Sequence, residues 1–178
     1  MNKTAKQRLD ERQAELNHSA KKALGQNFLI SDHVINKIIL ATQSLNPKKI
    51  IEIGPGLGAI TDLLIELPSD YQCIEMDKGL YEYWKAKDLL IHNMDALKFD
   101  WMSIDSDILV SNLPYQISSS IVIDRSIDAK QLNGMVLMFQ KEVAQRIKAQ
   151  PKTSEYGMLT VIAQEFWNIE VVCDAGPK

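Results

Sequence analysis

Four consecutive residues, Asn112-Leu113-Pro114-Tyr115, have the chemistry to methylate an amino group that is conjugated with an aromatic ring. The nitrogen of such a group is a poor nucleophile because its lone pair is delocalised into the ring. Two acceptors, the Asn112 side-chain oxygen and the Leu113 backbone carbonyl, could hold its N–H bonds out of the ring plane. Pro114 stiffens the turn, and Tyr115 offers a face for stacking a base, worth roughly 1–3 kcal/mol. An ordinary turn after a strand uses the same residue types.

A glycine cluster and two acidic residues could bind a cofactor that contains adenosine. The cluster, Gly54 to Gly58, has the spacing G-x-G-x-G rather than the G-x-G-x-x-G of dinucleotide sites. Gly54 and Gly56 allow a ligand to approach the backbone closely. Glu75 lies 21 residues after Gly54, where an acid can bind both ribose hydroxyls. Asp95 could accept from an adenine amino group, although an Asp there also suits a turn or a helix N-cap. Without a typical third glycine or an Arg for phosphates, the pattern favours S-adenosyl-L-methionine over NAD.

Strands and helices alternate along most of the chain, which predicts a parallel sheet covered by helices on both faces. The expected strands are 50–53, 71–76, 89–92, 108–113 and 135–139, and the expected helices are 31–45, 58–67, 80–87, 117–126 and 141–149. Two further apolar runs, 159–166 and 169–172, have no crossover helix between them and predict an antiparallel hairpin. The predicted fold is therefore α/β, with a mostly parallel seven-stranded sheet and that hairpin at one end. Open sheets of this kind bind ligands at the carboxyl ends of their strands.

Composition limits the classes of protein that this chain can belong to. Its 178 residues, 46% of them apolar, suit one globular domain, and no run is long enough to span a membrane. The first 20 residues are charged and are not a secretory signal; we expect a frayed helix or a mobile extension. Cys73 and Cys173 are isolated, which predicts buried thiols and a cytoplasmic protein. The three His residues are scattered, so no metal site is expected.

The net charge of −3 is unusual for a protein that binds nucleic acid, because contacts to phosphates normally supply much of the affinity. Basic residues are nevertheless clustered locally, at Lys21-Lys22, at Lys48-Lys49 and at Lys141, Arg146, Lys148 and Lys152.

Seven motifs, taken in order, make the chain resemble the ribosomal RNA adenine dimethyltransferases of the small subunit. They are Lys21 to Leu29 (KKALGQNFL), Glu52 to Gly58, Ile74 to Asp77, Asp95 to Leu97, Asn112 to Tyr115, Gln140 to Arg146 and Tyr156 to Leu159. The resemblance implies a Rossmann-like methyltransferase fold that uses S-adenosyl-L-methionine. It also implies N6,N6-dimethylation of two adjacent adenosines near the 3′ end of small-subunit rRNA, on a pre-30S particle, during ribosome biogenesis.

The resemblance also implies roles for single residues. Asn27 and Leu29 would contact the cofactor from the N-terminal segment, and Gly54, with Gly56 beside it, would lie against its methionine part. Glu75 would bind the ribose and Asp95 the adenine. Asn112 would sit between the cofactor and the target base. No metal and no membrane are expected as partners, and a monomer is expected.

The resemblance divides the chain into a charged extension, residues 1–20, and a catalytic domain, residues 21–178. Members of the family continue into an aromatic- and proline-rich stretch and a small helical domain that this chain lacks. We therefore expect weak or absent methylation of RNA by these 178 residues alone.

Three other functions are compatible with parts of this pattern. The first is methylation of large-subunit rRNA, as in antibiotic resistance. The second is methylation of another conjugated amino group, in DNA adenine or a protein glutamine, although the segment from Lys21 to Phe28 argues against it. The third is a non-catalytic assembly or transcription factor that keeps the same fold.

Overall fold

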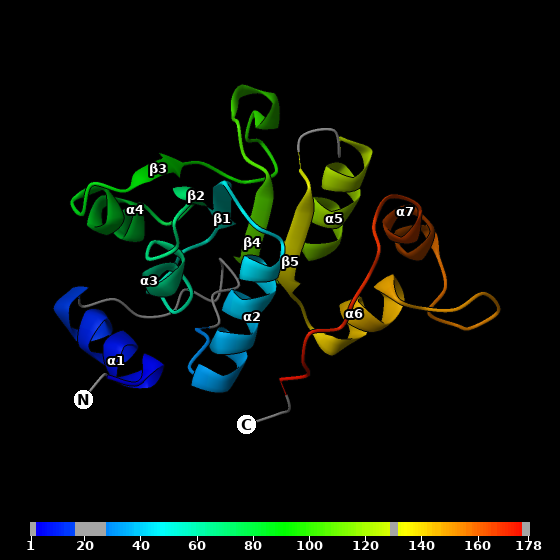
Figure 1. The fold of residues 1–178 in the computed structure, drawn as a ribbon, viewed down its shortest axis with the longest axis horizontal. Helices are drawn as coiled ribbons and strands as arrows, with labels where there is room; N and C mark the ends of the chain where they lie inside the picture. Colours follow the sequence, from blue (N-terminus) through cyan, green and yellow to red (C-terminus); the bar gives the residue numbers. More distant parts are fainter. Residues whose placement is uncertain (1–2, 17–27, 129–131, 176–178) are drawn as a thin grey trace.

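The computed structural model describes residues 3–16, 28–128 and 132–175. One five-stranded sheet forms its centre, and all of its paired strands are parallel (Figure 1). The strand order is β3-β2-β1-β4-β5, so the chain moves outward from β1 on one side and then returns to β4 on the other. The strands are β1 (Lys49–Ile53), β2 (Asp70–Glu75), β3 (Leu90–Asn93), β4 (Ile108–Asn112) and β5 (Gly134–Met138). Ligands of such sheets bind where the strand order reverses, here between β1 and β4.

Helices cover both faces of the sheet, as alternating strands and helices predict. On one face, α2 packs Val34, Ile35, Ile38 and Ile39 against strand residues that include Ile50 and Val110. On the other face, α5 contributes Ile121 to a cluster with Ile51, Ile53 and Leu109. The helices on the two faces and at the ends are α2 (Asp32–Ser44), α3 (Thr61–Leu64), α4 (Lys78–Lys85), α5 (Ser118–Ile127), α6 (Lys141–Ile147) and α7 (Met158–Phe166). A 3-10 turn, η2 (Trp101–Ser103), precedes β4.

The prediction of seven strands with an antiparallel hairpin is wrong for the part of the chain that the structure describes. Residues 159–166 lie in helix α7, and residues 169–172 are in neither a helix nor a strand. Leu159, Thr160 and Ala163 are buried on one side of α7, which is helical spacing. The Thr160 side chain also accepts from the Gly157 N–H at 3.1 Å and fixes the start of the helix. A short apolar run alone does not distinguish a buried strand from a helix.

The charged N-terminal segment forms a docked helix, α1 (Ala5–Leu16), beside α3 (Figure 1). A helix was one of the two expected structures for this segment. Its close packing was not expected, because the segment has no broad apolar stripe; Ala5 and Leu9 supply the buried contacts.

Cys73 is fully buried, as predicted, whereas Cys173 is partly exposed. Among the described residues, no helix is long and apolar enough to cross a bilayer.

Candidate functional site

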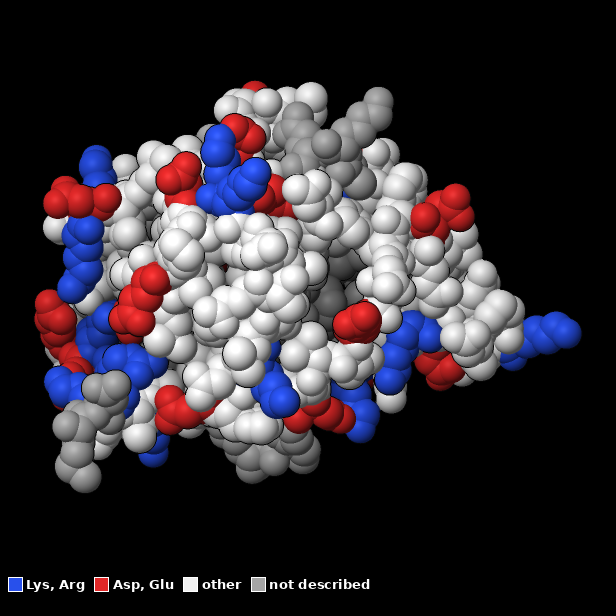
Figure 2. Space-filling model, viewed as in Figure 1, with Lys and Arg blue, Asp and Glu red and all other residues white. Residues whose placement is uncertain are grey.

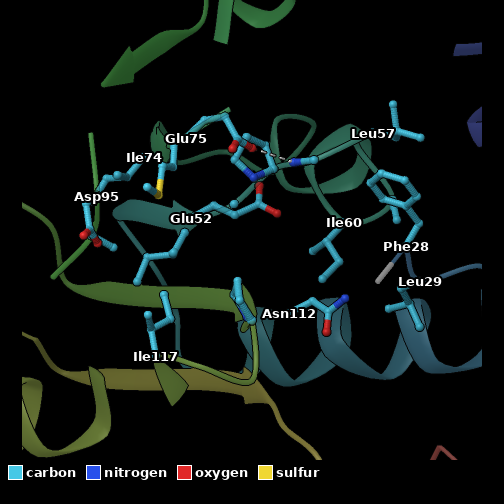
Figure 3. Close-up of a pocket in the computed structure, with 18 of the residues that line it drawn as sticks. Phe28, Leu29, Glu52, Leu57, Ile60, Ile74, Glu75, Asp95, Asn112 and Ile117 are labelled. Atoms are coloured by element: carbon cyan, nitrogen blue, oxygen red, sulfur yellow. Dashed lines mark hydrogen bonds between the residues drawn. The ribbon is translucent and has the colours of Figure 1, made fainter. Parts of the chain in front are cut away.

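A cavity of about 250 Å³ lies at the carboxyl ends of the strands, where the sequence motifs were expected to meet (Figure 3). Residues that follow each of the first four strands line it: Gly54 after β1, Glu75 and Met76 at the end of β2, Asp95 after β3, and Asn112 at the end of β4. The pairing of neighbouring strands explains this convergence, since Ile53 lies opposite both Ile74 and Ser111. The structure therefore brings the predicted strand-end residues into one cavity.

The glycine cluster forms a tight loop on one wall of this cavity. Gly54, Gly56 and Gly58 have φ values of +69°, +55° and +83°, which residues with a Cβ atom rarely adopt. The Gly54 N–H donates to the Ile74 carbonyl at 2.8 Å and ties the start of the loop to β2. A Cβ added at Gly54 would meet no atom within 4 Å, so this residue faces open space. The loop thus exposes backbone to the cavity, as the glycine pattern predicts.

Glu75 is a buried carboxylate, with 6% of the residue exposed. One of its oxygens accepts from the Gly56 N–H at 3.3 Å (Figure 3). The other accepts from the Asp77 N–H at 2.8 Å. Burial raises the pKa of Glu75 above its ordinary value, and the two backbone N–H groups oppose that rise. Each oxygen keeps further lone pairs, so the carboxylate can also accept from the two hydroxyls of a diol.

Asp95 lies at the opposite end of the cavity from Phe28 and Leu29 in Figure 3. One Asp95 oxygen accepts from the Leu97 N–H at 3.0 Å. Asp95 therefore stabilises a turn, which is the alternative role that its sequence position suggests. The same residue lines the cavity, where Met94 and Ala96 provide apolar surface on either side of it in sequence. This end of the cavity can therefore hold a flat apolar ring that carries a hydrogen-bond donor.

The Asn-Leu-Pro-Tyr turn contributes unequally to the cavity. Asn112 and Pro114 line it, whereas Leu113 and Tyr115 do not. Leu113 is buried, and its N–H donates to the Met138 carbonyl at 3.2 Å, which fixes the turn to β5. Tyr115 is 47% exposed, so its ring is accessible to a large ligand outside the cavity. The turn thus has a face toward the cavity and an aromatic side chain toward solvent.

The N-terminal segment supplies the wall opposite Asp95. Leu29 is buried and lines the cavity, and Phe28 lines it as well. A Cβ added at Gly56 would lie 3.6 Å from the Phe28 ring, which therefore packs close to the glycine loop. Asn27, the other residue expected here, lies outside the described residues.

Glu52, a buried acid of β1 for which the sequence alone indicates no role, also lines the cavity. Its Oε2 accepts from the Thr61 hydroxyl at 2.9 Å and from the Tyr71 hydroxyl. Burial raises the pKa of Glu52 from 4.5 to about 7, and these two hydrogen bonds lower it. The signal was available in the sequence, since a lone acid within Ile50-Ile51-Glu52-Ile53 is a polar residue in an otherwise buried strand.

We expect this glutamate to make the protein less stable as the pH rises from 4.5 to about 7. In that window the folded state holds the Glu52 proton and the unfolded state loses it, so ionisation at higher pH costs roughly 3 kcal/mol of unfolding free energy. In urea unfolding over a pH series, Glu52→Gln should therefore become more stable relative to the wild type by that amount across the window, and by no more above it.

Tyr71→Phe also tests whether the pKa of Glu52 is raised. It should increase the pH dependence of stability, which Glu52→Gln should remove. Tyr71→Phe removes a hydrogen bond to the charged form, so the pKa of Glu52 should rise further, and the loss of stability should still begin near pH 4.5 but extend to higher pH. A stability difference between Glu52→Gln and the wild type that does not vary with pH would show that the pKa of this carboxyl is not raised.

Comparison with known proteins agrees with this geometry. Residues 17–178 match a family described as ribosomal RNA adenine dimethylase. A Bdellovibrio bacteriovorus protein named ribosomal RNA small subunit methyltransferase A is 50% identical over 177 residues, which is 98% of this chain and 65% of that protein. The chain thus spans about two thirds of the length of this curated relative.

Two solved structures resemble the fold. A dimethyladenosine transferase from Plasmodium falciparum superposes with a TM-score of 0.68 and 30% identity, over 78% of this chain and 52% of that one. The 23S rRNA methyltransferase ErmE superposes with a TM-score of 0.59 and 25% identity, over 74% of this chain and 53% of that one. Both likenesses agree with a Rossmann-like fold built on a parallel sheet.

Proposed function

Because the chain belongs to the ribosomal RNA adenine dimethylase family, we propose that it takes part in the methylation of rRNA. The proposed reaction transfers methyl groups from S-adenosyl-L-methionine to N6 of two adjacent adenosines near the 3′ end of small-subunit rRNA, in the cytoplasm, during ribosome biogenesis. The observation that carries this proposal is the cavity in which Gly54, Glu75, Asp95 and Asn112 meet.

The charge of the cavity favours this cofactor over a nucleotide with phosphates. Three acidic residues, Glu52, Glu75 and Asp95, are among the described residues that line it, and no Lys or Arg is among them. The carboxylates of such a lining that are ionised repel phosphate groups and attract a cation. S-adenosyl-L-methionine carries a sulfonium and an ammonium, and no phosphate, so it fits this acidic lining.

The shape and polarity of the walls suit the parts of the cofactor in order. Asp95, between Met94 and Ala96, would accept from the adenine amino group, and Glu75 would accept from the ribose hydroxyls. The open side of Gly54 would lie against the methionine part, with Leu29 beyond it. This order would place the sulfur near the end of β4, next to Asn112.

The residues at the end of β4 would act on the adenine amino group. When bound, S-adenosyl-L-methionine would supply an electrophilic methyl: a carbon–nitrogen bond would form as the carbon–sulfur bond breaks toward sulfur, and the amino nitrogen would release its proton to water. The Asn112 side-chain oxygen and the Leu113 carbonyl would accept from the amino group and direct its lone pair toward the methyl. Orientation of this kind can lower a barrier by roughly 7–11 kcal/mol. Tyr115, exposed outside the cavity, would stack on the target base.

Basic residues close to this end of the sheet support an RNA substrate. Helix α6 begins at Lys141, three residues after Met138, which pairs with Asn112 in the sheet. Arg146 lies on the same helix, and Lys148 follows it. On the face shown in Figure 2, basic and acidic side chains are interspersed rather than gathered into one basic surface. We therefore expect phosphate contacts to be local and close to the catalytic turn.

The two rRNA alternatives differ in the support that they receive. The relative at 50% identity is named for the small subunit, whereas the large-subunit enzyme ErmE is 25% identical. The small subunit is therefore the better-supported target.

The deciding experiment compares methyl transfer from labelled S-adenosyl-L-methionine to unmethylated small subunits, to naked rRNA and to DNA, side by side. We expect N6,N6-dimethyladenosine in the small-subunit rRNA when the full-length protein is used. Preferential methylation of DNA or of large-subunit rRNA would contradict the proposed substrate. Cofactor binding without methyl transfer to any of them would favour a non-catalytic role.

A further inference from the structure

Helix α1 packs tightly on the domain although it lies outside the family match, which begins at residue 17. Ala5 and Leu9 are 0% and 3% exposed, so this charged helix buries one side against the domain. The Ala5 N–H donates to Asp32 Oδ1 at 2.9 Å and joins the start of α1 to the start of α2. Leu9 also lines the cavity that we assign to the cofactor. This helix therefore contributes directly to a wall of the site.

Arg12 connects α1 to the glycine loop. Its Nη1 donates to the Leu57 carbonyl, and its Nη2 donates to Asp62 Oδ1 at 3.0 Å. Its guanidinium lies 4.9 Å from the centre of the Trp84 ring, and only 14% of its side chain is exposed. A planar guanidinium can hold two acceptors and stack on an aromatic ring at once, which a lysine cannot do.

Trp84, on which Arg12 stacks, also holds the glycine loop. Trp84 Nε1 donates to the Gly56 carbonyl at 2.9 Å, so two successive loop carbonyls, those of Gly56 and Leu57, are fixed from outside the cavity. A Cβ added at Gly58 would lie 2.0 Å from Arg12 Nη1 and 2.7 Å from the Trp84 ring. The loop, Arg12 and Trp84 are therefore packed against one another without room for a side chain at Gly58.

We infer that α1 is part of the cofactor site and that Arg12 is a positioning residue for S-adenosyl-L-methionine, acting through the Leu57 carbonyl of the glycine loop. This inference rests on the proposed function. Its consequence is a linkage: cofactor binding and the docking of α1 stabilise each other. Coupling between two equilibria is reciprocal, so each must shift the other by the same factor.

Arg8 provides a matched control on the same helix. It also pairs with Asp62, with its Nε 3.2 Å from Oδ2, but it makes no described contact with the glycine loop. Arg8→Ala and Arg12→Ala each remove one positive charge and one ion pair with Asp62. Only Arg12→Ala also releases the Leu57 carbonyl and removes the stacking on the Trp84 ring.

The test is calorimetric titration of wild type, Arg8→Ala, Arg12→Ala and Arg12→Lys with S-adenosylhomocysteine. We expect Arg12→Ala to bind about tenfold more weakly than wild type, Arg8→Ala to stay within about threefold, and Arg12→Lys to recover part of the loss. Equal affinities of the two alanine variants would overturn the role of Arg12. Absence of binding by the wild type would instead overturn the proposed function, and this inference with it.

Hydrogen exchange of the wild type provides a measurement that needs no variant. The amides of α1 should exchange about tenfold more slowly when S-adenosylhomocysteine is saturating, because the ligand disfavours undocking of the helix. Exchange of the α1 amides that stays unchanged at a ligand concentration that slows exchange in the glycine loop would overturn the linkage.

Discussion

Asn112→Ala is expected to lower the rate of methyl transfer by the full-length protein by about 10²- to 10³-fold, the loss typical of removing one preorganised polar contact from a reacting group. Asn112 lines the cavity at the carboxyl end of β4, where the amino group would be held. Without its oxygen, the lone pair of the amino group would stay delocalised in the ring. The measurement is single-turnover transfer of labelled methyl to unmethylated small subunits.

Two comparisons separate this role from a structural one. Asn112→Asp keeps an acceptor oxygen at the same position, so it should retain more activity than Asn112→Ala. Both variants should bind S-adenosylhomocysteine and should unfold near the wild-type midpoint, since Asn112 is only partly buried. Near-normal turnover by Asn112→Ala would reject the proposed acceptor.

Glu75→Ala is expected to weaken binding of S-adenosylhomocysteine by about 10²-fold, because hydrogen bonds to a charged acceptor contribute roughly 1.5–3 kcal/mol. The variant loses the acceptor for the ribose hydroxyls. It also loses the bonds that the carboxylate accepts from the Gly56 and Asp77 N–H groups, so the glycine loop is held less firmly. Calorimetric titration measures the affinity directly.

The neighbouring acid, Asp77, is the control for this variant. Its side chain caps α4 by accepting from the Gly79 N–H at 2.9 Å, and it does not line the cavity. Asp77→Ala should lower the unfolding free energy by about 1 kcal/mol, as the loss of an N-cap does, and should change the affinity little. If Asp77→Ala and Glu75→Ala weakened binding equally, Glu75 would have no specific role in the site.

The strand-end residues were predictable from sequence because chemistry and fold agree there. Gly54, Glu75, Asp95 and Asn112 each follow an apolar run, and parallel strands bring such positions to one edge of a sheet. The order of the strands was not needed for this prediction. The position of α2 was equally clear, since Ser31 caps it and its buried residues have helical spacing.

The features that could not be predicted from the sequence depend on contacts between residues far apart in the chain. A short apolar run such as 159–166 fits either a strand or a helix, and packing against α5 makes it a helix. The docking of α1 depends on pairs such as Arg12 with Asp62, which lie 50 residues apart and leave no periodic signal. The sequence does not predict that Leu9 lines the cavity, for the same reason.

A crystal structure of the protein with S-adenosylhomocysteine tests the central claim most directly. We predict the adenine beside Asp95, the ribose hydroxyls on Glu75 and the sulfur facing Asn112 across the open side of Gly54. A ligand bound away from the carboxyl ends of β1, β2 and β4, or one whose sulfur is separated from Asn112 by protein, would contradict the account.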